Sequence, residues 1–335
     1  KMSDLSLMGL IEIIPKIPML ISRIKLTANS IISQNPDVLI TIDSPDFCMR
    51  VAKKVRNALP NLKIIHYVAP SVWAWRPERA AKMSKYVDHV LALLPFEPPY
   101  MEAEGMTCDF VGHPAVSSPH VSKKAQEKFK KKYNLHNGPI ITVLPGSRIG
   151  EIKRMCPIFN KVLNNIEKLY PDSQFILPVA SSVEKDVVNA VKSWNIKPLL
   201  LLNEGKDLKE LEHDKFITYS ISSAALATSG TVSLELAAKK CPMIVAYKAN
   251  WITTKMVKKL AKIDTANLIN IITDTKVIPE HLFESCTVEN ITESLRLLLN
   301  NDNNQIKAME ETMNRLGASR KDIHLLAANS VLSNI

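Results

Sequence analysis

Residues 140–151 read Ile-Ile-Thr-Val-Leu-Pro-Gly-Ser-Arg-Ile-Gly-Glu. The opening run of apolar and β-branched residues, closed by Pro145-Gly146, is typical of a buried strand. From Glu151 to Leu169 the apolar residues recur at helical spacing instead. A strand, a glycine turn and a helix in this order form part of a βαβ unit. The segment therefore predicts an α/β protein built on a parallel sheet.

The same alternation continues through most of the chain. Predicted strands cover 38–42, 63–68, 89–94, 109–112, 140–144, 174–179, 199–202, 224–228 and 243–247. Predicted helices cover 47–58, 77–85, 96–103, 151–169, 183–193, 231–239 and much of 288–333, and another begins at 206–213. This βαβα rhythm favours parallel sheets joined by crossover helices.

The region 117–138 interrupts the rhythm, because Ser, Lys, Glu and Gln dominate it and His136-Asn137-Gly138 closes it. We interpret it as a surface helix and a turn near a domain boundary. Two Rossmann-like domains, 1–116 and 117–318, are therefore expected, with their parallel sheets facing a cleft. Residues 319–335 are expected to form a C-terminal helix that can pack back on the first domain.

Composition limits the class of protein. The chain of 335 residues is 46% hydrophobic and carries a net charge of +10, which suits phosphates, nucleic acid or an anionic membrane. No nucleic-acid-binding signature is present, so nucleic acid is not expected as a partner. The five cysteines are widely spaced and form no C-x-x-C pair, which favours a reducing cytoplasm over a disulfide framework.

An apolar stripe lies near the start of the chain. Its members are Ile11, Ile13, Ile14, Ile17, Leu20 and Ile21, at helical spacing and edged by cations. Pro15 and Pro18 predict a kinked or divided helix. The stripe is shorter than the roughly 20 residues that a membrane span needs. Two interpretations stay open, a helix facing the core and a surface that docks on a membrane or on acyl chains.

Two glycine turns have the form of phosphate sites. In Gly146-Ser147-Arg148, backbone N–H groups and the following helix N-terminus attract anions, and Arg148 offers a bidentate fork. Ser229-Gly230-Thr231 repeats this pattern, and Glu235 lies one turn further, where it can accept bonds from ribose hydroxyls. Simple helix capping is the alternative for both turns. P-loop and G-x-G-x-x-G fingerprints are absent.

A carboxylate follows the first predicted strand. Asp43 stands at the carboxyl end of 38–42, held by the Ser44-Pro45 turn, and is a candidate general base. We expect Asp46 to cap the helix that begins at Phe47. No third carboxylate or histidine lies close by, so a metal site is not predicted here.

The block 66–76 reads His-Tyr-Val-Ala-Pro-Ser-Val-Trp-Ala-Trp-Arg and holds two of the four tryptophans. Large apolar area beside a few polar groups indicates the wall of a binding site. The other candidates for contacts in the cleft are His66, His113 and Glu97. Asn267 and Asn270 follow in a predicted loop, where either can bind a sugar hydroxyl.

These blocks, in this order, resemble lipid-A-disaccharide synthase, a glycosyltransferase family with a GT-B-like fold. The matching pieces are Met8-Gly9 with Ile11-Glu12, 42–47, 66–76, 94–97, 110–114, 144–148 with Glu151, 229–231 with Glu235, and 240–243. The chain departs from the family at two places. The Gly-rich strand–loop–helix that opens the family is expected before residue 1, and Ile269 stands where the family usually has Pro.

The resemblance implies an inverting transfer of diacylglucosamine from UDP-2,3-diacylglucosamine to the 6-hydroxyl of 2,3-diacylglucosamine 1-phosphate. The products are the β-1,6 lipid A disaccharide and UDP, and no cofactor is implied. It implies Asp43 as base, Arg148 as a contact of the diphosphate and Asn270 as a contact of the substrate. We expect Ser71 and Arg76 to face the sugar-phosphate, and Trp73 and Trp75 to pack the loop or shield acyl chains.

The resemblance also favours a peripheral protein on the inner face of the cytoplasmic membrane, with the apolar stripe against lipid or acyl chains. A homo-oligomer is compatible with it. Two alternatives stay open. One is another UDP-sugar enzyme of this fold, such as a UDP-N-acetylglucosamine epimerase. The other is a non-catalytic remnant that binds lipid or nucleotide.

Overall fold

The computed structural model describes residues 16–205, 207–228, 230, 232–249, 254, 264–300, 304–320 and 322–335. Five residues with predicted roles, Ile11, Ile13, Ile14, Ser229 and Thr231, lie outside these ranges. The chain divides into two compact units. The amino-terminal unit contains the described residues up to Pro114 together with those from Ser319 to Ile335, and the second unit contains the described residues from Ala115 to Ala318.

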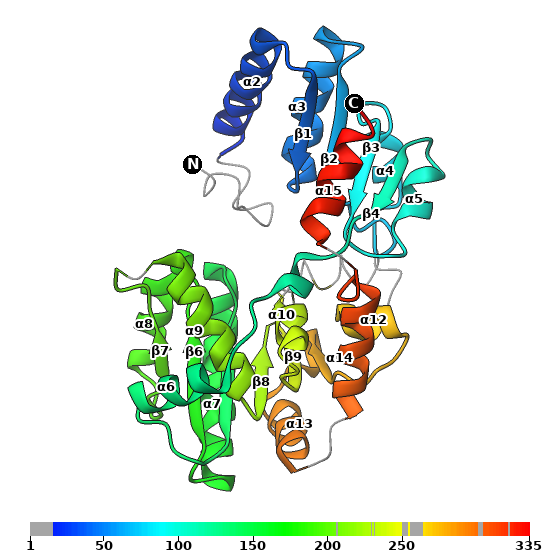
Figure 1. The fold of residues 1–335 in the computed structure, drawn as a ribbon. Coiled ribbons are helices and arrows are strands. Elements are labelled where there is room, and N and C mark those ends of the chain that lie inside the picture. The colour runs from blue at the N-terminus through cyan, green and yellow to red at the C-terminus, as the bar shows by residue number, and fades with distance from the viewer. Residues whose placement is uncertain are drawn as a thin grey trace. The chain divides into compact units, whose positions relative to one another are not determined.

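The amino-terminal unit is built on a four-stranded parallel sheet of order β1-β2-β3-β4 (Figure 1). Its strands are β1 (Val38–Ile42), β2 (Lys63–Tyr67), β3 (His89–Ala92) and β4 (Thr107–Phe110). Its helices are α2 (Ile17–Gln34), α3 (Pro45–Ala58), α4 (Glu78–Met83), α5 (Pro98–Glu102) and α15 (Ile323–Leu332).

Helices cover both faces of this sheet. Neighbouring residues Ile64 and Ile65 of β2 point to opposite faces, and both are fully buried. Ile64 packs into the core formed with α2 to α5, whereas Ile65 packs on the face that carries Ala327 and Val331 of α15. Burial on both faces explains why the strands are nearly continuous apolar runs.

A partly buried polar network joins α15 to the sheet. The Ser330 hydroxyl lies 2.9 Å from Nε2 of His89 and donates to Oδ2 of Asp109 at 2.6 Å. Burial lowers the pKa of His89. Arg320, just before the helix, donates to the carbonyl of Phe110 and stacks on its ring. Residues far apart in the sequence thus complete one unit.

The second unit is built on a six-stranded parallel sheet of order β10-β9-β8-β5-β6-β7. The strands are β5 (Ile140–Leu144), β6 (Gln174–Pro178), β7 (Leu199–Leu201), β8 (Ala224–Ala227), β9 (Met243–Tyr247) and β10 (Glu280–Leu282). The helices are α6 (Lys123–Lys132), α7 (Ile149–Leu169), α8 (Glu184–Lys192), α9 (Leu208–Ile221), α10 (Val232–Ala238), α12 (Leu268–Thr273), α13 (Val288–Asn300) and α14 (Asn304–Arg315).

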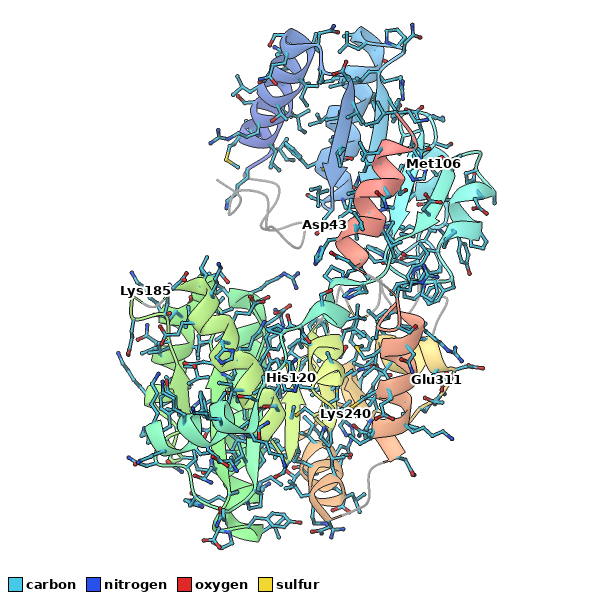
Figure 2. The ribbon with its side chains drawn as sticks, viewed as in Figure 1. Asp43, Met106, His120, Lys185, Lys240 and Glu311 are labelled. Atoms are coloured by element: carbon cyan, nitrogen blue, oxygen red, sulfur yellow. The ribbon has the colours of Figure 1, made fainter. Side chains whose placement is uncertain are left out.

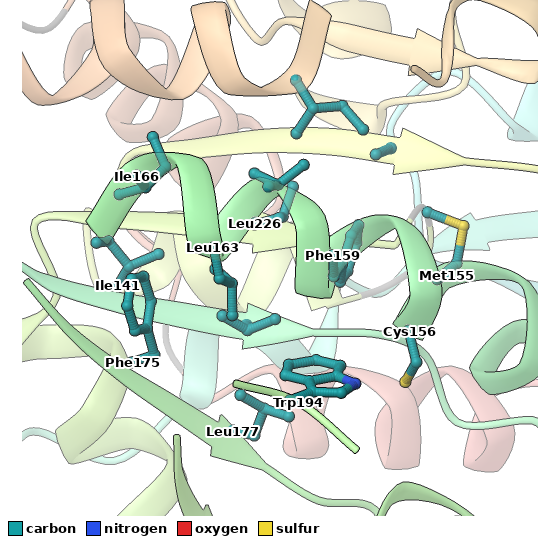
Figure 3. Close-up of a cluster of buried hydrophobic side chains, with 14 of the residues drawn as sticks. Ile141, Met155, Cys156, Phe159, Leu163, Ile166, Phe175, Leu177, Trp194 and Leu226 are labelled. Carbon is teal, nitrogen blue, oxygen red and sulfur yellow. The ribbon is translucent and has the colours of Figure 1, made fainter. Parts of the chain in front are cut away.

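The main core of this unit lies under α7 (Figure 3). Phe159 and Leu163 of α7 are fully buried against Ile141 of β5 and Leu226 of β8. Trp194, which follows α8, closes the same cluster. On the other face, α6 and α9 pack on β5 and β6 through Phe129 and neighbouring residues. The apolar residues that recur at helical spacing from Glu151 to Leu169 therefore face this core, as helical periodicity requires.

The α/β class with parallel sheets is confirmed. The helix predicted to begin at 206–213 is α9, which begins at Leu208, and α2 extends from the apolar stripe to Gln34. Other local predictions were wrong. The predicted loop around Asn270 is the short helix α12, and β10 was not predicted. No described helix combines the length and the apolar character needed to cross a membrane.

Asp46 was also predicted wrongly. The helix α3 begins at Pro45, with Ser44 at the N-cap, so Asp46 lies inside the first turn. Proline suits the first helical position, which moves the start of the helix before Asp46. The Asp46 carboxylate is paired with Arg79 at 3.1 Å instead of capping the helix.

Replacing Leu163 by Ala should lower the free energy of unfolding of the second unit by about 3 kcal/mol, because it opens a cavity in the core under α7. Leu169 ends the same helix and is half exposed. Leu169→Ala is the matched control and should change stability by less than about 0.5 kcal/mol. Urea denaturation followed by circular dichroism measures both, and equal effects would contradict the assigned core face.

Candidate active site

The strand order of the second sheet creates a switch point beside β5. From β5 the chain builds outward through β6 and β7, then returns to the other side of β5 through β8, β9 and β10. Open α/β sheets bind ligands at such a point, beyond the carboxyl ends of the strands. Leu144 ends β5, and its carbonyl accepts the N–H of Thr228, the residue that follows β8. Both predicted phosphate turns therefore leave the sheet side by side.

The first turn already holds an anion, the side chain of Glu151. Its carboxylate accepts the N–H of Ser147 at 3.0 Å and a bond from Arg148 Nη1 at 2.7 Å. Glu151 is almost fully buried. Gly146 has φ of +117°, and a Cβ there would lie 2.4 Å from Glu151 Oε2. Glycine is needed for both reasons, and the turn has the donors of an anion site.

The second turn is described in part. Gly230 has φ of +153°, a conformation that only glycine adopts readily. The buried Oγ1 of Thr228 has no hydrogen-bond partner among the described residues. A buried hydroxyl without a partner is costly unless water or a ligand supplies one. Glu235 of α10 is half-buried, and its two oxygens lie 3.0 and 3.1 Å from Nζ of Lys215.

Asp43 lies exposed at the carboxyl end of β1 (Figure 2). Its N–H donates to the carbonyl of Tyr67 at 2.9 Å, which ties this loop to the end of β2. Asp43 and Ser44 both have positive φ, +51° and +45°. The carboxylate makes no ion pair within the described part of the chain, so an incoming hydroxyl can reach it.

His66 lies beneath this loop, fully buried in β2. Its Nδ1 is 2.7 Å from Oγ1 of Thr41, and its Nε2 has no partner among the described residues. Burial lowers the pKa of His66 to about 4, against the opposing charge of Asp43. The imidazole is therefore neutral at neutral pH, and its role is to support the edge of the sheet.

The block 66–76 begins as strand β2 and continues as a turn. Val68 has φ of +81°, which is strained for a β-branched residue. The carbonyl of Ser71 accepts the N–H groups of Ala74 and Trp75, so the block folds on itself. Ser71 is exposed, and Arg76 is half-buried with φ of +52°. Both polar residues that were predicted to face the substrate thus stay accessible.

Glu97 anchors Trp73 of this block to the end of β3. The N–H groups of Leu93 and Leu94 donate to one Glu97 oxygen, and Trp73 Nε1 donates to the other at 3.3 Å. Phe96 packs edge-on against the Trp73 ring. Glu97 is 3% exposed, and burial raises its pKa to about 7. The sequence marked Glu97 as a candidate, but only the structure shows this anchoring contact.

His113 and Asn270 lie in different units. His113 follows Gly112, whose φ is +86°, and burial lowers the pKa of His113 to about 4. Asn270 is buried in α12, where its amide donates to the carbonyl of Ile278 and to Glu280, and its oxygen accepts the Ile278 N–H. Its side chain therefore ties α12 to the segment that leads to β10. The predicted substrate contact of Asn270 stays a prediction.

A pocket of about 250 Å³ also lies in the amino-terminal unit. It is lined by Val72, Pro77, Ala80, Pro99, Tyr100, Ala103 and Glu104. Val72 belongs to the block 66–76, but none of the residues predicted to bind substrate or UDP or to act as base lines the pocket. Within the described ranges, no group of three or more His, Cys, Asp or Glu side chains is arranged to hold a metal ion.

Solved structures share this architecture. A UDP-GlcNAc 2-epimerase from Neisseria meningitidis, bound to UDP-GlcNAc, aligns over 92% of this chain and 80% of its own, with a TM-score of 0.61 and 13% identity. A glycosyltransferase from Rickettsia africae aligns over 94% of this chain and 80% of its own, with a TM-score of 0.53 and 15% identity. At these identities the likeness concerns the fold, which is that of the GT-B class of enzymes.

Relatives in sequence identify one family within the GT-B class. The family model described as lipid-A-disaccharide synthetase matches residues 1–332. Lipid-A-disaccharide synthase of Ruegeria pomeroyi is 45% identical over 334 residues, which are 100% of this chain and 83% of the relative. That of Rhodospirillum centenum is 38% identical, covering 100% of this chain and 82% of the relative. The chain therefore belongs to the lipid-A-disaccharide synthase family, a glycosyltransferase family of lipid A biosynthesis.

Replacing Gly146 by Ala should lower the free energy of unfolding by roughly 1–3 kcal/mol, because the new Cβ meets Glu151 and the positive φ becomes strained. Gly205 is the matched control, since it also has positive φ but no atom within 4 Å of the place that a Cβ would take. Gly205→Ala should therefore cost less. Urea denaturation compares the two, and a larger loss for Gly205→Ala would contradict the contact.

Glu97 should give the amino-terminal unit a measurable pH dependence. Its folded pKa, about 7, exceeds the reference value of 4.5, so the folded state keeps a proton that the unfolded state releases. Its contribution to stability is therefore full below pH 4.5 and is lost as the pH rises to 7. Relative to Glu97→Gln, wild type should lose roughly 3 kcal/mol over this range.

Comparison with the variant is needed because His66 and His113, with lowered pKa values, change stability in the opposite direction over much of this range. Urea denaturation followed by tryptophan fluorescence at several pH values measures the difference. Exposed Glu104→Gln is the control and should track wild type. Parallel curves for wild type and Glu97→Gln would show that Glu97 titrates normally.

Proposed function

We propose that this protein transfers 2,3-diacylglucosamine from UDP to the 6-hydroxyl of 2,3-diacylglucosamine 1-phosphate, with inversion at the anomeric carbon. The observation that carries the proposal is the family match over residues 1–332. Two relatives that align over the whole of this chain also carry the name lipid-A-disaccharide synthase. An epimerase function has weaker support, because the UDP-GlcNAc 2-epimerase structures share the fold at only 13% to 15% identity.

We assign the donor UDP to the switch point of the second sheet. The diphosphate is assigned to the Ser147 N–H, to Arg148 and to the backbone at Gly230. Ser229 and Thr231 are added to this set from the sequence alone. The support is the anion geometry of the first turn, whose donors bind the Glu151 carboxylate. Glu235, held by Lys215, is assigned to the ribose hydroxyls.

We assign the acceptor side of the reaction to Asp43. In an inverting transfer the 6-hydroxyl attacks the anomeric carbon from the face opposite UDP, in one displacement. The Asp43 carboxylate takes the hydroxyl proton while the new C–O bond forms. UDP leaves with the electron pair of the broken bond, and Arg148 stabilises the charge that develops on its phosphate. The exposure of Asp43 at the edge of the sheet supports this role.

We further propose that the protein works at the inner face of the cytoplasmic membrane, where its acylated substrates reside. The described part of the apolar stripe supports this. Ile17 and Ile21 of α2 are exposed, and Leu20 is half-buried. Such a face, with the cations Arg23 and Lys25 beside it, suits contact with lipid or acyl chains.

Asp43→Ala should lower the rate of disaccharide formation by about 10²–10⁴-fold, because it removes the proposed base. Asp37→Ala is the matched control, since it removes an exposed carboxylate just before the same strand and should leave the rate unchanged. Purified protein is incubated with both substrates, and disaccharide and UDP are measured. No product from wild type would refute the proposed function, whereas equal rates for wild type and Asp43→Ala would reject Asp43 alone.

A further inference from the structure

Two arginines stack on one tryptophan in the amino-terminal unit. The guanidinium carbon of Arg76 lies 4.4 Å from the centre of the Trp75 ring, and that of Arg79 lies 5.2 Å from it. Arg79 belongs to the first turn of α4, directly after the block 66–76. An aromatic face attracts a guanidinium without using its N–H donors. The stack, defined by these three residues, therefore positions two cations whose donors can still bind a ligand.

Only one carboxylate compensates these two charges among the described residues. Arg79 Nη2 donates to Asp46 Oδ2 at 3.1 Å and lies 3.4 Å from Oδ1. The Asp46 side chain is 82% exposed and that of Arg79 is 21% exposed. Because Asp46 is exposed and solvent screens its charge, the pair contributes little to stability and does not account for the arrangement. Glu78, also in the first turn of α4, is exposed and pairs with neither arginine in the described part of the chain. The stack keeps a net positive charge.

The stack adjoins the loop that carries the proposed base. Asp46, the partner of Arg79, lies only three residues after Asp43. The backbone is in the left-handed region at Asp43, Ser44 and Arg76. Such conformations are unfavourable for residues other than glycine, and they gather where a structure holds a ligand. Charge and backbone geometry thus point to the same place, the carboxyl edge of β1 and β2.

We propose that Arg76 and Arg79, stacked on Trp75, bind the 1-phosphate of the acceptor sugar, an inference that rests on the proposed function. A phosphate monoester carries between one and two negative charges at neutral pH and accepts paired bonds from guanidinium groups. On binding, the phosphate replaces Asp46 as the partner of Arg79. The donor diphosphate uses Arg148 in the other unit, so the two phosphates of the reaction have separate cations.

Binding of glucosamine 1-phosphate to the whole chain, measured by titration calorimetry, tests the proposal without turnover. Arg76→Gln and Arg79→Gln should each weaken binding roughly tenfold, because each removes a charged donor. UDP binding should not change. Asp46→Asn should strengthen binding of glucosamine 1-phosphate, because it removes the competing carboxylate. Lys85→Gln removes an exposed charge elsewhere in the unit and should have no effect.

A ligand site requires that Arg79→Gln weaken binding of glucosamine 1-phosphate and that Asp46→Asn strengthen it. A purely structural ion pair does not predict these opposite changes in affinity. If both variants weaken binding, Asp46 and Arg79 only support each other and the proposal fails. It also fails if the arginine variants weaken UDP binding instead, or if inorganic phosphate binds as tightly as glucosamine 1-phosphate. Thermal unfolding confirms that each variant is folded.

Turnover distinguishes this inference from the proposed function. With active wild type, Arg79→Gln should raise the KM for the phosphorylated acceptor roughly tenfold and leave the KM for the UDP donor unchanged. An unchanged KM for the acceptor would overturn the inference alone. An inactive wild type would refute the proposed function, while binding of glucosamine 1-phosphate would still report on the stack.

Discussion

Parallel pairing is the constraint on which the whole structure depends. Because every strand of a parallel sheet runs the same way, each loop that leaves a strand emerges at one edge. The chain must turn sharply there, and it does so with positive φ at Asp43 and Val68 in one unit and at Gly146 and Gly230 in the other. The candidate residues lie at these edges because the strands end there.

Carboxylates of the chain hold the cations at these edges. Arg148 is paired with Glu151, Arg79 with Asp46, and Lys215 with Glu235. Each pair keeps a flexible cationic side chain in a fixed place, which lowers the entropy lost when a ligand binds. The pairs differ in burial. Glu151 is enclosed with the turn that it bonds, whereas Asp46 is exposed and easily displaced.

Agreement between sequence and structure is best where burial follows a simple period. The strands at 38–42 and 140–144 and the end of α7 at Leu169 were predicted at the residues where they occur, because both strands are apolar runs and α7 buries one regular face. The prediction failed at α12 and β10, which have six and three residues and are too short to show a period. There the fold depends on Asn270, whose amide bonds the backbone of Ile278 eight residues later. Hydrophobic periodicity cannot predict such a contact.

The sequence by itself determined the α/β alternation, the glycine positions and the family, because these are properties of neighbouring residues and of motifs in order. Tertiary structure decided which segments meet. It placed β5 between β6 and β8, attached α15 to the first sheet through Ser330, and brought Arg79 to Asp46. Strand order and such long-range contacts depend on the packing free energy of distant segments, which no local pattern encodes.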